Sequence, residues 1–106
     1  MTPAERLRAA ATRLREVAGD ATPGPWGAEY SKVSGHCVVD AKSTNCLDSV
    51  ARATHFRDSA DAAYIAMMHP PAALALADWL DETARWVPVM EEPLAVADAV
   101  LGGEQR

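Results

Sequence analysis

Two adjacent prolines, Pro70 and Pro71, constrain the fold of this 106-residue chain more than any other feature. Proline has no backbone N–H to donate and disfavours helical geometry in the residue before it, so the alanine-rich stretch 58–85 cannot form one continuous helix. We therefore expect two helices joined at an extended His69. Pro70 or Pro71 opens the second helix, and Asp58 caps the first by accepting a hydrogen bond from a backbone N–H of its first turn.

The second of these helices is predicted to bury one side. Small and apolar residues recur along it at helical spacing, while charged residues occupy the other side. The predicted inner positions are Ala73, Leu76, Trp79, Leu80, Thr83, Ala84 and Val87. Trp79 and Trp86 should supply most of the apolar area of this segment, directed toward the core or toward a second copy of the chain.

Helices are also predicted near both ends of the chain. Residues 2–5, Thr-Pro-Ala-Glu, form a capping-box pattern that begins a helix reaching about Ala18, with Gly19 as a natural stop. A last short helix begins at 91–93 and is terminated by the glycines at 102–103.

Between residues 26 and 52 the helical period disappears, and short runs alternate with turn residues. This pattern predicts a three-stranded antiparallel β-meander. The predicted strands are Trp26–Val33, His36–Asp40 and Ser43–Val50. A two-residue second loop would place Cys37 opposite Cys46, whereas a longer loop would shift this pairing.

The length of the chain allows one compact domain with one core. We expect a single small α+β domain over residues 1–106, with an N-terminal helix, a three-stranded antiparallel β-meander, a helical hairpin and a short C-terminal helix. The small core and the apolar residues of the connection 86–92 lead us to expect a homodimer.

The formal net charge of -5 is unevenly distributed, because residues 1–57 carry eight basic and six acidic side chains and residues 58–106 carry two and nine. Nucleic-acid binding usually needs a concentrated basic surface. The candidates for such a surface are Arg6, Arg8, Arg13 and Arg15. Acidic residues interrupt this set, so a solvated helix face is favoured and a nucleic-acid partner is not expected.

The sequence has no apolar run long enough to cross a membrane and no signal-peptide pattern, so we expect a soluble intracellular protein. Cys37 and Cys46 are too few for a disulfide scaffold. In a reducing compartment they are expected to be free thiols.

One constellation has the atoms for metal or thiol chemistry: His36, Cys37, Cys46 and His55. Thiolates and imidazoles bind zinc, and an imidazole beside a thiol can activate it as a nucleophile. The spacing matches no usual paired-ligand pattern, and neighbours in a strand point to opposite faces. Small buried thiols are favoured, and we predict no catalytic residue, no metal and no cofactor.

Three further features have ordinary structural explanations that we favour. Asp58 and Asp61 at the start of a helix are best explained by capping and by the helix dipole. His69 is best explained by loop hydrogen bonding. Trp26, which follows the proline-rich corner 22–25, is better explained as a plug of the core than as a stacking platform for a flat ligand.

The chain resembles the Ead/Ea22-like phage proteins, and small similar proteins occur in actinobacteria and their phages. The resemblance is carried by Ala21-Thr-Pro-Gly-Pro-Trp26, a β-like middle, Asp61-Ala-Ala-Tyr-Ile-Ala66, and Pro70 with Ala73-Leu-Ala-Leu76. It covers about residues 5–85. It implies an early-region accessory protein of undefined molecular activity and brings no catalytic residues to this chain.

We therefore expect a non-enzymatic phage or prophage accessory protein in the cytoplasm of a bacterial host, which blocks a host protein or sequesters a small, nucleotide-like ligand. The candidate ligand-binding residues are Trp26, Tyr30, His36, His55 and His69. Two alternatives stay open. One is a small metal- or thiol-dependent hydrolase using the cysteine and histidine constellation, and the other is a DNA-associated regulator using the arginines of the first helix.

Overall fold

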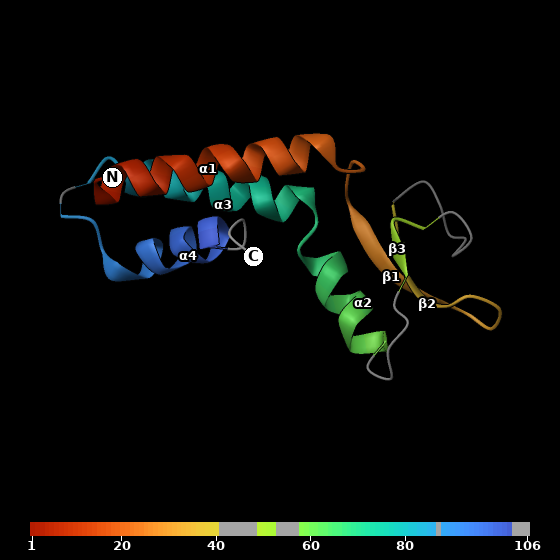
Figure 1. The fold of residues 1–106 in the computed structure, drawn as a ribbon. Coiled ribbons are helices and arrows are strands. Elements are labelled where there is room, and N and C mark those ends of the chain that lie inside the picture. The colour runs from red at the N-terminus through yellow and green to blue at the C-terminus, as the bar shows by residue number, and fades with distance from the viewer. Residues whose placement is uncertain (41–48, 53–57, 87, 103–106) are drawn as a thin grey trace. The chain divides into compact units, whose positions relative to one another are not determined.

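The computed structural model describes residues 1–40, 49–52, 58–86 and 88–102 (Figure 1). Its elements are α1 (Pro3–Asp20), β1 (Trp26–Ser31), β2 (Gly35–Asp40), β3 (Ala51–Arg52), α2 (Asp58–Met67), α3 (Pro70–Thr83) and α4 (Glu91–Gly102). The predicted α+β class and the order of its elements are confirmed. None of the helices in the described part of the chain is long and apolar enough to cross a membrane.

Contacts divide the chain into two compact units. Met1–Asp20 with Ala73–Arg106 forms one, called here the helical unit, and Ala21–Ala72 forms the other, called the sheet unit. The predicted single domain depends on how the two units combine, and it stays a prediction.

In the helical unit, α1 begins with the predicted capping box. The backbone N–H of Glu5 donates to Thr2 Oγ1 over 3.1 Å, and the backbone N–H of Thr2 donates to Glu5 Oε1 over 3.3 Å. The side-chain hydrogen bond with Thr2 is the main cause of a lowered pKa of Glu5. At the other end, α1 continues two residues beyond the predicted Ala18, to Asp20.

The core of the helical unit lies where α1, α3 and α4 meet, and Figure 1 shows α1 running alongside both other helices. The buried residues of this core are Leu7, Ala10, Ala11, Ala77, Leu80, Ala84 and Ala97. Alanine lets helix backbones approach closely. Leu7 and Leu80 are the largest fully buried side chains of this core, so each contributes more hydrophobic stabilisation than any of the alanines.

The predicted inner side of α3 is only partly right. Leu80 and Ala84 are buried, but Trp79 is 43% exposed and Trp86 is 66% exposed. The buried stripe includes Ala77, which shifts its centre away from Trp79. Because alanines set the spacing of these helices, the interior leaves no room for an indole. The tryptophans therefore do not form the core, and Val87 lies outside the described residues.

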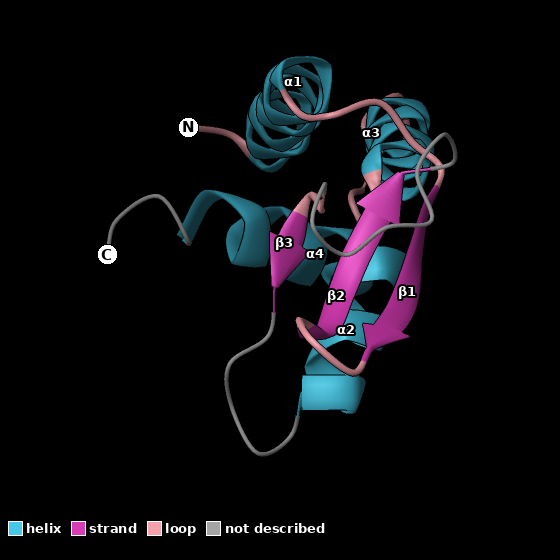
Figure 2. Cartoon of the chain, turned by 90° about the vertical axis from the view of Figure 1, so that its right-hand side faces the viewer, coloured by secondary structure: helices cyan, strands magenta, loops and turns pink. Residues whose placement is uncertain are grey.

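In the sheet unit, β1, β2 and β3 form an antiparallel sheet in that order, and α2 covers one face of it (Figure 2). Val38 is buried there against Ala62 and Ala66 of α2. Side chains alternate along a strand, so the buried Cys37 and Val39 occupy the opposite face.

The turn between β1 and β2 comes close to its predicted position, although β1 ends at Ser31 rather than Val33. Ser31 pairs with Gly35, which leaves a three-residue loop, and Gly35 has a φ of +78° that favours glycine. The Oγ of Ser31 accepts hydrogen bonds from the backbone N–H groups of Val33 and Ser34, at 3.2 and 3.3 Å.

The described third strand, β3, lies just beyond the predicted strand Ser43–Val50, and the expectation of a free thiol at Cys37 is wrong. Cys37 lies opposite Arg52 instead of Cys46, because the connection from Asp40 to β3 is much longer than two residues. Of the predicted strand 43–50, only residues 49–50 are described, and they precede β3. Cys37 is disulfide-bonded rather than a free thiol. The chain's other cysteine, Cys46, lies outside the described residues.

Candidate functional site

A corner of the chain, residues 22–26, is bound to the hinge between α2 and α3, residues 69–71. The backbone N–H of Trp26 donates to His69 Nδ1 over 3.1 Å. Gly24 lies so close to the hinge that an added Cβ would be 2.6 Å from Cδ of Pro71. The corner also closes on itself, because Trp26 Nε1–H donates to the carbonyl oxygen of Thr22 over 2.9 Å. We call this set of contacts the corner–hinge lock.

The lock determines the roles of its two aromatic side chains. His69 acts through Nδ1 as the acceptor of the Trp26 N–H, a role that a ring nitrogen fills with its lone pair. The half-buried Trp26 packs against the cluster formed by Val38, Ala62 and Ala66. Both residues therefore contribute to the structure of the sheet unit, as the sequence had favoured.

The predicted ligand-binding residues separate into two pairs. Trp26 and His69 meet in the lock, whereas Tyr30 and His36 face each other across β1 and β2 with ring centroids 4.8 Å apart. Tyr30 lies four residues further along β1 than Trp26. His55 lies outside the described residues, and ligand binding by this set stays a prediction.

The cysteine and histidine constellation is altered by the state of Cys37. A disulfide-bonded sulfur is neither a thiolate ligand nor a nucleophile. His36 faces the same side of the sheet as Val38, opposite to Cys37. Cys46 and His55 are not described. Over residues 1–40, 49–52, 58–86 and 88–102, no three His, Cys, Asp or Glu side chains gather in a metal-binding arrangement.

An apolar surface that the sequence reading missed lies on α2. Ala62 and Ala66 pack on the sheet, while Tyr64, Met67 and Met68 lie on the other side with exposed fractions of 65%, 65% and 44%. Their spacing of three and four residues puts them on one helix face. Met68 directly follows α2 and continues its last turn, because its N–H donates to the carbonyl oxygen of Tyr64 over 3.2 Å. We call Tyr64, Met67 and Met68 the α2 outer face. The spacing of these three residues carries the signal for this face in the sequence.

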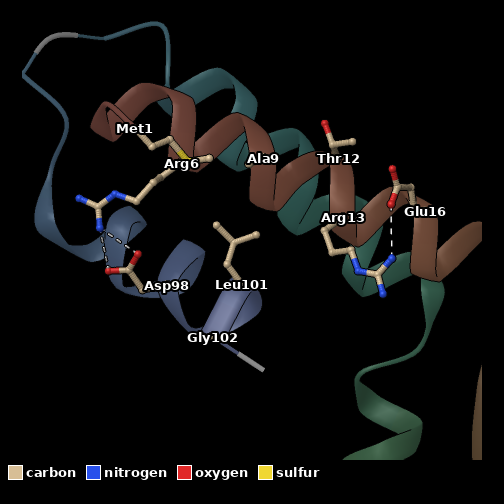
Figure 3. A pocket seen from close by; sticks show the side chains of 9 residues that line it. All are labelled: Met1, Arg6, Ala9, Thr12, Arg13, Glu16, Asp98, Leu101 and Gly102. Carbon is tan, nitrogen blue, oxygen red and sulfur yellow. Dashed lines mark hydrogen bonds and ion pairs between the residues drawn. The ribbon is translucent and has the colours of Figure 1, made fainter. Parts of the chain in front are cut away.

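A groove with a volume of about 840 Å³ lies between α1 and α4 in the helical unit (Figure 3). It is lined by Met1, Arg6, Ala9, Thr12, Arg13, Glu16, Asp98, Leu101 and Gly102. Arg6 Nη1 lies 3.0 Å from Asp98 Oδ1, and Arg13 Nη1 lies 3.4 Å from Glu16 Oε2. Carboxylates already neutralise both guanidinium groups, so the groove has little positive charge with which to bind an anion.

A third arginine of α1, Arg15, bridges two carboxylates of α3. Its Nη1 lies 2.6 Å from Asp81 Oδ2 and its Nη2 lies 3.0 Å from Asp78 Oδ1. The hydrogen bond with Asp78, followed by that with Asp81, raises the pKa of Arg15. The charge asymmetry of the sequence thus serves ion pairs within the helical unit, which disfavours these arginines as a nucleic-acid surface.

Comparison with known proteins identifies one family. The family model described as Ead/Ea22-like protein matches residues 11–100, a span that contains the corner, the hinge, the whole sheet and both central helices. No curated protein and no solved structure matches the chain.

Proposed function

Because this chain belongs to the Ead/Ea22-like family of phage-type proteins, we propose that it is a non-enzymatic accessory protein that binds a protein of its bacterial host cell through the α2 outer face. The observation that carries the proposal is the exposure of Tyr64, Met67 and Met68 on a helix whose opposite side is already buried. A helix that is apolar on both sides is usually buried on both sides.

The chemistry of the α2 outer face suits a protein partner. Methionine is unbranched and flexible, so it adapts to an irregular apolar surface. Tyrosine supplies a large ring and a hydroxyl that can find a hydrogen-bond partner, and it is enriched at protein interfaces. The partner should therefore present an apolar depression that takes Tyr64, surrounded by surface that the methionines can cover.

The sheet unit supports this face from behind. The inner side of α2 packs on β1 and β2, and the corner–hinge lock fixes the residues that follow its C-terminal end. A surface that is already ordered loses less conformational freedom on binding, so more of the contact energy is retained as affinity.

The same contacts disfavour a small, nucleotide-like ligand at the predicted aromatic residues. Trp26 and His69 use their polar groups on each other and on the corner, and the ring of Tyr30 contacts that of His36. These polar groups are therefore already engaged and are not free to orient a ligand that stacks on the exposed ring of Tyr30. A protein partner on the α2 outer face does not depend on them.

The proposal is tested by placing a photo-crosslinking amino acid at position 64 in host cells, identifying the crosslinked protein and measuring its binding with both proteins purified. The variant Tyr64→Lys/Met67→Lys is expected to weaken binding at least about tenfold, as loss of an interface centre does. The matched control is Val33→Lys, which changes an almost fully exposed apolar residue in the hairpin turn of the same unit. It should leave the affinity unchanged within about twofold, as for surface changes away from a contact.

Two results would overturn the proposal. One is the absence of any protein that crosslinks from position 64 and binds saturably when purified. The other is a purified partner whose affinity is the same for wild type and for Tyr64→Lys/Met67→Lys. A saturable thermal shift with a nucleotide, abolished by His36→Ala, would replace the proposal by the small-ligand function.

A further inference from the structure

The flank of α3 that points away from the helical core carries Trp79, and Trp86 lies three residues beyond Thr83, the last residue of α3. Tight hydrogen-bonded turns follow the helix, so the seven positions from Trp79 to Trp86 make about two turns and bring the two indoles to the same side. Beyond the end of α3 the chain continues as a hydrogen-bonded turn, in which the N–H of Trp86 donates to the carbonyl oxygen of Thr83 over 3.1 Å. Both indoles are exposed, although tryptophan is normally among the most buried residues on average.

Between the two tryptophans lie opposite charges. Arg85 Nη1 is 3.2 Å from Glu82 Oε2, and both side chains are mainly exposed. We call Trp79, Glu82, Arg85 and Trp86 the tryptophan surface. Such a surface has an aromatic ring toward each end and one charge of each sign between them.

This arrangement is complementary to itself under a two-fold rotation. If the axis passes midway between positions 82 and 83, Trp79 of one copy meets Trp86 of the other, and Glu82 of one copy approaches Arg85 of the other. Closed dimers are built from one patch that contacts itself in this way. We propose that the tryptophan surface is the interface of a two-fold homodimer in which the α3 helices run antiparallel.

The two tryptophans supply about half of the area that a specific dimer needs. From the size of an indole, the two tryptophans expose roughly 250 Å² in each copy, so a dimer would bury roughly 500 Å² of aromatic surface. A specific interface needs about 1,000 Å² in total. The proposal requires the other half to come from the rim, where the side chains of Glu82, Arg85 and Met90 are exposed. The partner at this surface is a second copy of this chain.

This inference is independent of the proposed function, because the α2 outer face belongs to the sheet unit and shares no residue with the tryptophan surface. Sedimentation over a wide range of protein concentrations measures it directly. Wild type is expected to approach twice the chain mass of 11.3 kDa. The variant Trp79→Ser/Trp86→Ser should dimerise at least about tenfold more weakly, as loss of interface tryptophans does. The control, Tyr64→Ser/Met67→Ser, should dimerise like wild type.

The charges and the geometry are tested with two further measurements. Glu82→Arg should weaken the dimer, and Glu82→Arg/Arg85→Glu should restore it. A photo-crosslinker at position 79 should link to a peptide containing residue 86 of a differently labelled copy. The charge variants and the crosslink report on the interface even if the double serine variant does not fold. A mass of 11.3 kDa at every concentration, or a dimer insensitive to all of these changes, would overturn it.

Discussion

The helical unit and the sheet unit differ in how their contacts are distributed. In the helical unit, many small contacts share the stabilisation: alanines on three helices, a capping box, and ion pairs on the surface. In the sheet unit, strand pairing and one small cluster are supplemented by a lock between distant residues, made of one N–H···N hydrogen bond across 43 positions and one glycine against a proline ring. It follows that most single substitutions should have little effect on the stability of the helical unit. In the sheet unit, a substitution that adds or removes only one or two atoms of the lock should have a measurable effect.

The largest loss of stability should come from truncating one of the few large side chains that are buried in the helical unit. Leu80→Ala removes a fully buried side chain and leaves a cavity among alanines, which should cost about 2–5 kcal/mol of unfolding free energy. The matched control is Leu74→Ala on the same helix, whose side chain is exposed. Denaturant unfolding followed by circular dichroism measures both. Equal costs for the two variants would contradict the burial described for α3.

The next effect tests whether one methyl group can disturb the sheet unit. Gly24→Ala puts a Cβ 2.6 Å from Pro71 Cδ, so the corner must move, and overpacking of this kind should cost about 1–3 kcal/mol. Gly27→Ala is the control, because nothing lies within 4 Å of the added Cβ there. Adding Pro71→Ala to Gly24→Ala should recover part of the loss. Amide hydrogen exchange in the sheet unit reports each change, and a Gly24→Ala variant no worse than Gly27→Ala would refute the lock.

A smaller effect is expected from the hydrogen bond of the lock. His69→Leu removes the acceptor and leaves the partly buried N–H of Trp26 unpaired, which should cost about 1 kcal/mol. His69→Asn is the informative partner variant, since its side-chain oxygen can take the place of Nδ1 and should recover most of the loss. The exchange rate of the Trp26 amide distinguishes the two. If Asn protects this amide no better than Leu, the bond is not what holds the corner.

The smallest effect concerns the cap of α1. Thr2→Ala removes the acceptor of one hydrogen bond and should cost roughly 0.5 kcal/mol, at the low end for helix caps, because this hydrogen bond is exposed to solvent. The bond with Thr2 lowers the pKa of Glu5 below its ordinary value of 4.5. A lowered pKa in the folded state means that its contribution is present above pH 4.5 and is lost as the pH falls through the folded value. The difference in melting temperature between wild type and Thr2→Ala should therefore narrow in acid. In a Glu5→Gln background it should not depend on pH over this range.

These two units also explain how far the sequence could predict the fold. The helices were predictable because caps, prolines and apolar periodicity act over three or four residues, as at Thr2 and Glu5 or at Pro70. The side of α3 was predicted less well, because apolarity alone favoured Trp79 and Trp86 for the interior. Their size decides otherwise, since the spacing of the surrounding helices is set by alanines on α1 and α4.

The sheet unit was less predictable because its contacts depend on pairing between distant residues. The hairpin turn has a local signal in Ser34-Gly35, whereas the register of β3 depends on a connection whose length no local pattern reveals. Structural roles for Trp26 and His69 were favoured from the sequence, but their contact with each other has no sequence signal. The α2 outer face could have been found from the spacing of Tyr64, Met67 and Met68.

The most direct test of the corner–hinge lock is a through-hydrogen-bond scalar coupling experiment by NMR on the ¹⁵N-labelled protein, at a pH where the imidazole is neutral. The structure predicts a cross-peak between the backbone nitrogen of Trp26 and Nδ1 of His69, with the imidazole proton on Nε2. An imidazole proton on Nδ1, with no coupling to Trp26, would show that the corner and the hinge are not joined in this way, and the account of the sheet unit would be wrong.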